Sequence, residues 1–286
     1  MGKDPIVEYL RSHAGEEEQK KHAFGARFSN PLVWTLFILQ SIFGVLFAIF
    51  VKYGVSSDGK PTEDGSAVMS SFYGVYMDVH VMIFIGFGFL MTFLRKYGYS
   101  SVGITFLLGA ICIQWYILVG SFFEQIIYLK HFENIHINIP LLIRSDFAAG
   151  AVLITFGALL GKTSALQMIF VAILELVFYS INEAISLNLG IADIGGSMVI
   201  HMFGAYFGLA ASIFITPSKA KGNKDNSAVY HSDLFSMIGT IFLWMYWPSF
   251  NGALLGSSAG QQRAVRYFLI FLFFFFFDTK IKLKFF

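Results

Sequence analysis

The stretch GGSMVIHMFGAYFGLAAS, residues 195–212, decides the fold class, because it is an apolar run interrupted by a single imidazole, His201. A helix needs about 20 mainly apolar residues to cross the hydrocarbon of a bilayer. Small residues four apart let helix backbones approach closely in a membrane. The residues that share the helical face of His201 are small: Ser197, Gly204, Ala205, Gly208 and Ser212. The pattern predicts a membrane-spanning helix whose His201 points into packed protein rather than into lipid.

The composition of the whole chain agrees with this stretch. Of its 286 residues, 56% are hydrophobic and 13% are charged, where soluble domains carry roughly 25% charged residues. These values exclude a disordered chain and a collagen-like repeat, and a soluble enzyme of this length would need an implausibly apolar surface. We therefore predict an all-α polytopic membrane protein.

The residues that carry metal, redox or catalytic chemistry are sparse. Cys112 is the single cysteine of the chain, so neither a disulfide framework nor a cysteine-ligated metal site is available. No GxxxxGK[ST] phosphate-binding loop is present, and the histidines are scattered. A net charge of +2 favours no polyanionic partner such as nucleic acid. We expect that the protein is not an enzyme and that it binds neither a cofactor nor a metal ion.

Apolar stretches separated by polar links predict seven spans. The links at 53–77 and 217–233 are rich in Gly, Ser, Pro, Lys and Asp, which is typical of solvated loops. The predicted spans are residues 32–51, 78–94, 101–119, 141–160, 166–187, 196–216 and 234–256.

Lys and Arg are more frequent in the segments on the side of the amino terminus than in those on the other side. Because short cytoplasmic loops retain positive charge, we predict a cytoplasmic amino-terminal segment, residues 1–31, with no cleaved signal peptide. A transmembrane domain then covers residues 32–256. Residues 257–286 include a run of phenylalanines followed by lysines, and they form an atypical tail unlike the other spans.

Ionisable residues inside spans are costly, so each is a candidate site residue. The candidates are His80, Asp146, Glu175, Glu183, Asp193 and His201. His201 alone is compatible with a structural or a functional role, because one backbone carbonyl can satisfy a neutral imidazole. Asp193 can cap the start of its span, and it can attract cations at the mouth of a passage that has His201 deeper inside; the two roles are compatible.

Two aromatic residues have unusual neighbours. Phe147 is a bulky ring among small residues in RSDFAAGAVLITFG, and Phe250 follows Pro248, which can kink or open a helix. Spacing alone favours ordinary packing for both.

Several segments together carry a family resemblance. They are MDVHVMIFIGFGFLMTFLRKYGYSSVGITFLLGAICIQW (77–115), DFAAGAVLITFGALLGK (146–162), INEAISLNL (181–189), GGSMVIHMFGAYFGL (195–209) and SDLFSMIGTIFLWMYWPSFN (232–251). They closely resemble the Rhesus (Rh) glycoprotein branch of the ammonium transporter family, nearly continuously from about residue 33 to about residue 266. DVHVMIFIGFGFLMTF and LWMYWPSFN are highly specific to this branch.

The resemblance implies a homotrimer in the plasma membrane with one pore through each subunit, formed between two five-helix halves of inverted topology. Matched by motif, His201 falls on the first of two pore histidines, and Phe147 and Phe250 fall on the phenylalanines that close the outer pore entrance. Asp193 falls on the aspartate near the ammonium recruitment site, and Glu183 on an acidic residue of the outer vestibule. Asp146 and Asn251 neighbour the gating rings and receive supporting structural roles.

The implied function is an ammonium or ammonia channel, with carbon dioxide as an alternative substrate. Ammonium is attracted by carboxylates and aromatic faces, sheds its proton before a dry constriction, and passes as ammonia along imidazole nitrogens. In the family, the second pore histidine lies beyond the point at which this sequence stops resembling its relatives. We therefore expect a truncated chain, for which a non-conducting membrane-complex subunit or a non-functional product is the alternative.

Overall fold

The computed structural model describes residues 30–54, 63–220 and 222–255, together with positions 259, 260, 262, 263 and 266. The chain divides into two compact units, residues 1–46 and 47–286. The predicted amino-terminal segment, apart from its last two residues, lies outside the described residues, as does most of the Phe-rich tail.

The described part of the first unit is one helix, α2 (Pro31–Phe50), whose last four residues belong to the second unit. The sequence PLVWTLFILQSIFGVLFAIF contains no charged residue, and most of its side chains are exposed. An apolar helix of 20 residues with exposed apolar side chains has the length and surface expected of a membrane span.

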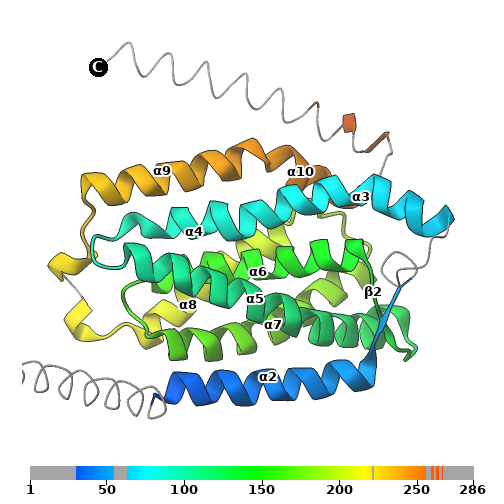
Figure 1. The fold of residues 1–286 in the computed structure, drawn as a ribbon, viewed down its shortest axis with the longest axis horizontal. Coiled ribbons are helices and arrows are strands. Elements are labelled where there is room, and N and C mark those ends of the chain that lie inside the picture. The colour runs from blue at the N-terminus through cyan, green and yellow to red at the C-terminus, as the bar shows by residue number, and fades with distance from the viewer. Residues whose placement is uncertain are drawn as a thin grey trace, which may run out of the picture. The chain divides into compact units, whose positions relative to one another are not determined.

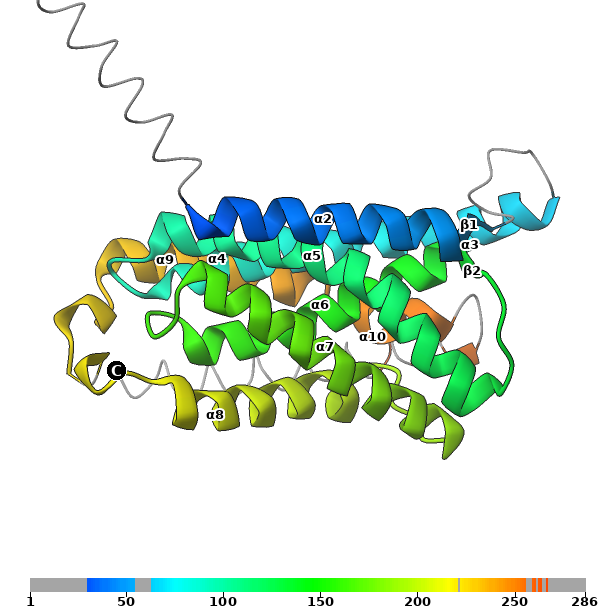
Figure 2. The same cartoon turned by 90° about the horizontal axis from the view of Figure 1, so that it is seen from below.

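The second unit is a bundle of helices with one short pair of parallel strands (Figures 1 and 2). The strands, β1 (Val51–Tyr53) and β2 (Ile135–Ile137), pair with Val51 opposite Ile135, and no sequence pattern predicted them. The remaining elements are α3 (Glu63–Val81), η1 (Met82–Gly86), α4 (Phe87–Leu90), η2 (Met91–Phe93), α5 (Gly98–Phe123), η3 (Glu124–Leu129), α6 (Ile139–Leu159), α7 (Ala165–Asn188), η4 (Ser197–Met202), α8 (Phe203–Ile215), η5 (Ser218–Ala220), η6 (Lys224–Asn226), α9 (Tyr230–Met245), α10 (Trp247–Gly252) and η7 (Ala253–Leu255).

Six helical stretches of the described chain are long and apolar enough to cross a membrane, which confirms the prediction of an all-α polytopic membrane protein. They correspond to the first six predicted spans and are Pro31–Phe50, Val68–Phe93, Gly98–Leu129, Ile139–Leu159, Ala165–Asn188 and Ser197–Ile215.

The seventh predicted span, 234–256, is not one continuous helix. Helix α9 ends at Met245, and the shorter α10 begins at Trp247, just before Pro248. Proline has no backbone N–H to donate and its ring clashes with the preceding turn, so it favours a break at this position.

The prediction of a loop over residues 53–77 was wrong where the structure describes this segment. Helix α3 begins at Glu63 and continues into the span that ends at Phe93, while residues 55–62 lie outside the described chain. The Gly and Ser residues of this stretch were read as loop signals, but their helix propensity is a weak preference that helix packing overrides. The predicted link 217–233 contains two short turns, η5 and η6, and α9 already begins at Tyr230.

An ion pair ties this link to the turn between α4 and α5. Lys96 Nζ donates to Asp225 Oδ2 at 2.8 Å, and this hydrogen bond raises the pKa of the Lys96 ammonium group above its ordinary value. The side chains of Lys96 and Asp225 are 59% and 39% exposed, so the pair contributes little to stability.

Helix α6 is the central element of the second unit and contacts α3, α5, α7 and α8. Its small residues Ala148, Ala149, Gly150 and Ala151 are buried, which allows neighbouring helices to approach it closely. On another side of the unit, α9 runs along α4 (Figure 1). There a side chain at Gly239 would clash with the backbone of Leu90 and Gly86.

We predict that Gly239→Ala lowers the free energy of unfolding by about 1–3 kcal/mol, because α4 and α9 must separate to admit a methyl group. The measurement is the thermal unfolding midpoint of the purified protein in detergent. Gly103→Ala is the matched control, since a Cβ at Gly103 of α5 meets no atom within 4 Å. Equal midpoints for the two variants would contradict the backbone contact.

Candidate functional site

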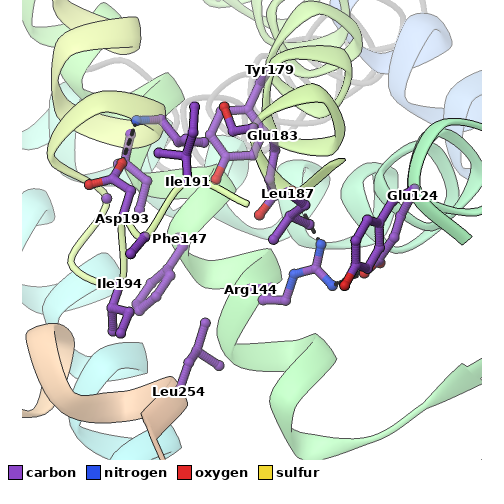
Figure 3. Close-up of a pocket in the computed structure, with 16 residues that line it drawn as sticks. Glu124, Arg144, Phe147, Tyr179, Glu183, Leu187, Ile191, Asp193, Ile194 and Leu254 are labelled. Atoms are coloured by element: carbon purple, nitrogen blue, oxygen red, sulfur yellow. Dashed lines mark hydrogen bonds and ion pairs between the residues drawn. The ribbon is translucent and has the colours of Figure 1, made fainter. Parts of the chain in front are cut away.

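A pocket of about 370 Å³ brings together three of the residues predicted from the sequence, Phe147, Glu183 and Asp193 (Figure 3). Its wall comes from α6, α7, the π-helical turns η3 and η4, the connection between α7 and η4, and the turn η7. The lining residues are Glu124, Tyr128, Arg144, Phe147, Tyr179, Glu183, Ser186, Leu187, Ile191, Ala192, Asp193, Ile194, Gly196, Val199, Ile200 and Leu254.

Arg144 organises the acidic side of this pocket. Its Nη1 lies 2.8 Å from both carboxylate oxygens of Glu124, and its Nη2 lies 3.5 Å from Glu183 Oε2. The hydroxyl of Tyr116 donates to the same oxygen of Glu183, and the guanidinium carbon lies 6.0 Å from the centre of the Tyr116 ring. Residues from α5, η3, α6 and α7 therefore meet in one charged cluster.

The lining charges leave the pocket acidic. Three carboxylates, those of Glu124, Glu183 and Asp193, line it together with one guanidinium, that of Arg144. The charge of Glu183 is partly offset by Arg144. The pocket still carries excess negative charge in a concave, partly apolar setting, which attracts cations.

Asp193 caps the helical segment that carries His201. Its Oδ2 accepts hydrogen bonds from the backbone N–H groups of Met198 and Val199, each at 2.8 Å. The span is not helical as far back as Asp193, because it begins at Ser197 after Gly196, which adopts a positive φ of 68°. Capping is therefore confirmed, and the carboxylate also lines the pocket.

Phe147, which is part of the pocket wall, contacts Phe250. Their ring centroids are 4.4 Å apart with an interplanar angle of 42°, and the two residues are 4% and 2% exposed. These residues lie on α6 and α10, more than a hundred positions apart. The structure thus brings together the two phenylalanines that the sequence motifs singled out.

His201 lies against Phe250 and Trp247. Its ring centroid is 5.8 Å from that of Phe250 and 5.5 Å from that of Trp247. Within the described chain, the buried Nε2 of His201 has no hydrogen-bond partner. Because a buried imidazole nitrogen normally has a partner, this atom is available to a small polar molecule.

The break between α9 and α10 places Phe250 and Trp247 against His201. Ser249 Oγ donates to Asp78 Oδ2 at 2.6 Å and so links α10 to α3. Asn251 Nδ2 donates to Trp247 O at 2.8 Å within α10, and its Oδ1 occupies the space that a side chain at Gly195 would need. Asn251 thereby sets the contact between α10 and the loop before η4.

Asp146 is fully buried beside Phe147 and is paired with His80. Both carboxylate oxygens lie 3.1 Å from His80 Nδ1. The histidine lies at the end of α3, so this pair fastens α3 to the central helix α6. The predicted supporting position of Asp146 thus has a specific partner.

Sequence reasoning missed four residues of this region: Tyr116, Glu124, Arg144 and Trp247. Arg144 was not singled out, although it lies within the predicted span 141–160 and within α6, with a side chain only 19% exposed. Its position inside an apolar span was the available signal. Among the described residues, no three His, Cys, Asp or Glu side chains are grouped so as to hold a metal ion.

Comparison with known proteins gives a consistent result. The family model described as Ammonium Transporter Family matches residues 36–274. Proteins named Ammonium transporter Rh type B are similar to this chain: the human one is 49% identical over 248 residues, which cover 84% of this chain and 53% of the human protein. The one from Oryzias latipes is 48% identical over 240 residues, which cover 80% of this chain and 51% of that protein.

A solved structure is also similar. The chain in "Nitrosomonas europaea Rh50 and mechanism of conduction by Rhesus protein family of channels" superposes with a TM-score of 0.62 at 32% identity. The match covers 71% of this chain and 54% of that one. The chain therefore spans about half the length of the relatives it matches.

We predict that Arg144→Met lowers the free energy of unfolding by about 3 kcal/mol, because it leaves the partly buried carboxylates of Glu124 and Glu183 without their cation. Thermal unfolding in detergent measures the change. Lys52→Met is the control, since Lys52 is exposed on β1. If both variants unfold at the wild-type temperature, the cluster does not stabilise the fold.

Proposed function

The chain belongs to the Rh branch of the Ammonium Transporter Family, and we propose that it takes part in the passage of ammonia across a membrane, recruited as ammonium. The observation that carries the proposal is the succession of an acidic pocket, the Phe147–Phe250 contact and the unpartnered Nε2 of His201. The protein is a multi-pass membrane protein.

The charge and chemistry of each element suit one stage of this passage. The excess carboxylates of the pocket favour ammonium over ammonia, and the rings of Phe147 and Phe250 can contact a cation through their π faces. A charged ion would lose its hydration at the Phe147–Phe250 contact, where both side chains are buried. That loss is too costly without compensation, so the species that continues is neutral ammonia.

His201 supports the passage of a neutral molecule. An imidazole offers a hydrogen bond without a fixed charge, and Nε2 is buried without a partner in the described chain. Sodium and potassium ions have no neutral form, so the same constriction excludes them. The oligomeric state, location and orientation are also part of the proposal. The protein forms a homotrimer in the plasma membrane, with a cytoplasmic amino terminus and an outward-facing pocket.

The test uses the 286-residue chain reconstituted in lipid vesicles that hold a pH-sensitive dye. An inward ammonium gradient raises the internal pH when ammonia enters, whereas an inward carbon dioxide gradient lowers it, so one assay separates the two gases. If vesicles with the protein are no more permeable to ammonia than protein-free vesicles, the proposal is contradicted and a non-conducting subunit is favoured.

We predict that His201→Leu reduces the protein-dependent ammonia permeability at least about tenfold, equivalent to about 1.4 kcal/mol, because a hydrogen-bonding nitrogen is replaced by an apolar group. The rate of internal alkalinisation measures the change. His231→Leu is the matched control, since His231 is an exposed residue at the start of α9. Equal permeability of both variants would remove His201 from the pathway.

Two substitutions of Asp193 separate its capping of η4 from its proposed attraction of ammonium. We predict that Asp193→Asn keeps the thermal midpoint close to wild type, because an amide oxygen also caps a helix, yet lowers the apparent affinity for ammonium. Asp193→Ala loses the cap as well and costs about 1 kcal/mol of stability. Concentration series of the vesicle assay and thermal unfolding provide the two readouts. Unchanged affinity in Asp193→Asn would show that Asp193 only caps.

A further inference from the structure

Glu175 lies in the middle of α7 and is fully buried. Its Oε1 is 2.7 Å from the hydroxyl of Thr155 on α6. Its Oε2 is buried and has no hydrogen-bond partner in the described chain. No Lys, Arg or His of the described residues forms an ion pair with it, unlike Glu124 and Glu183, which share Arg144.

The hydroxyl of Thr155 has two acceptors but only one proton. Besides Glu175 Oε1, the carbonyl oxygen of Gly204 on α8 lies 3.0 Å from Thr155 Oγ1. A hydroxyl provides one O–H donor and two acceptor lone pairs. If Glu175 were ionised, its Oε1 and the carbonyl oxygen of Gly204 would compete for the single hydroxyl proton of Thr155. The carboxylate would also leave Oε2 negatively charged and without a partner.

A proton on Glu175 resolves both problems. The acid O–H then donates to Thr155 Oγ1, and the Thr155 hydroxyl donates in turn to Gly204 O. Oε2 becomes a neutral carbonyl oxygen, whose lack of a partner costs far less than an isolated buried carboxylate. All three oxygens then have roles that their distances allow.

We propose that Glu175 is a carboxylic acid in the folded protein and that its proton joins α7, through Thr155 of α6, to the backbone of α8. The chain of hydrogen bonds lies where α6 and α8 approach closely. A Cβ at Gly204 would be only 2.6 Å from Ala151 O, and a Cβ at Gly208 would lie 3.0 Å from the Cα of Thr155. Close backbone contact leaves Gly204 O within reach of Thr155.

This junction makes Glu175 a positioning residue for His201, and that part of the inference rests on the proposed function. Gly204 follows His201 by one helical turn on the same face. Glu175 thereby fixes the segment that carries the imidazole while adding no charge beside the passage. Cys112 on α5 is a titratable side chain within electrostatic range of Glu175, and it is buried and carries no positive charge.

Infrared spectroscopy of the complete chain in lipid vesicles tests the protonation directly. A protonated carboxyl has a C=O stretching band well separated from the bands of carboxylates, and this band shifts in deuterium oxide. We expect the wild type to show one such band between neutral and mildly alkaline pH, and Glu175→Gln to lose it. Glu133→Gln is the matched control and keeps the band, since Glu133 is exposed. Absence of the band from the wild type overturns the inference, as does its persistence in Glu175→Gln.

Two further variants test the connection to Thr155 and α8. Thr155→Val retains the acid band but moves it, because the O–H loses its acceptor. Glu175→Gln keeps the thermal midpoint, since its amide can donate to Thr155 Oγ1, whereas Glu175→Leu lowers it. An unmoved band in Thr155→Val, or equal midpoints for the Gln and Leu variants, refutes the proton-mediated junction.

Ammonia permeability separates this inference from the proposed function. If the wild-type chain conducts ammonia, Glu175→Leu reduces the ammonia permeability, whereas Glu175→Gln keeps it at the wild-type value. A loss of permeability in both variants refutes the positioning role. If the wild type does not conduct, the proposed function and the positioning role fail together. The infrared band still decides whether Glu175 carries the proton.

Discussion

A polar group inside an apolar span must find its partner within the protein, and the arrangement of the helices in the second unit depends on this constraint. No water is available in the hydrocarbon region to replace a missing partner. Asp146 meets His80, Glu175 meets Thr155, and Arg144 meets Glu124 and Glu183. Each of these contacts joins two different helical segments, so satisfying the polar groups also fixes which helices are neighbours.

Small residues supply the complementary condition, because polar partners can meet only if the backbones approach closely. Gly204 and Gly208 lie directly on the α6 backbone, and Gly239 lies on the backbone of α4 and η1. Without a strong hydrophobic drive between helices in lipid, such packing supplies much of the association energy. The same close contact puts the Gly204 carbonyl beside Thr155.

The candidate site uses both features. The Arg144 cluster and the Asp193 cap fix the acidic side of the pocket, whereas the break between α9 and α10 brings Phe250 to Phe147 and Trp247 to His201. A continuous helix in place of α9 and α10 would direct these rings elsewhere. Irregular backbone at membrane depth is tolerated where it is buried in protein or lines a cavity, and both the α9–α10 break and the turn η4 adjoin the candidate passage.

The sequence by itself determined the membrane class and the first six spans, because apolar length and small-residue spacing are local properties. Phe147, Phe250, His201 and Asp193 were singled out together only by the resemblance to the family. The sequence did not reveal that α3 begins at Glu63 or that β1 pairs with β2. Only the tertiary structure decided which polar residues are partners. His80 and Asp146 are 66 positions apart, and Thr155 and Gly204 are 49 apart, so each pairing depends on how the helices pack and not on any local pattern.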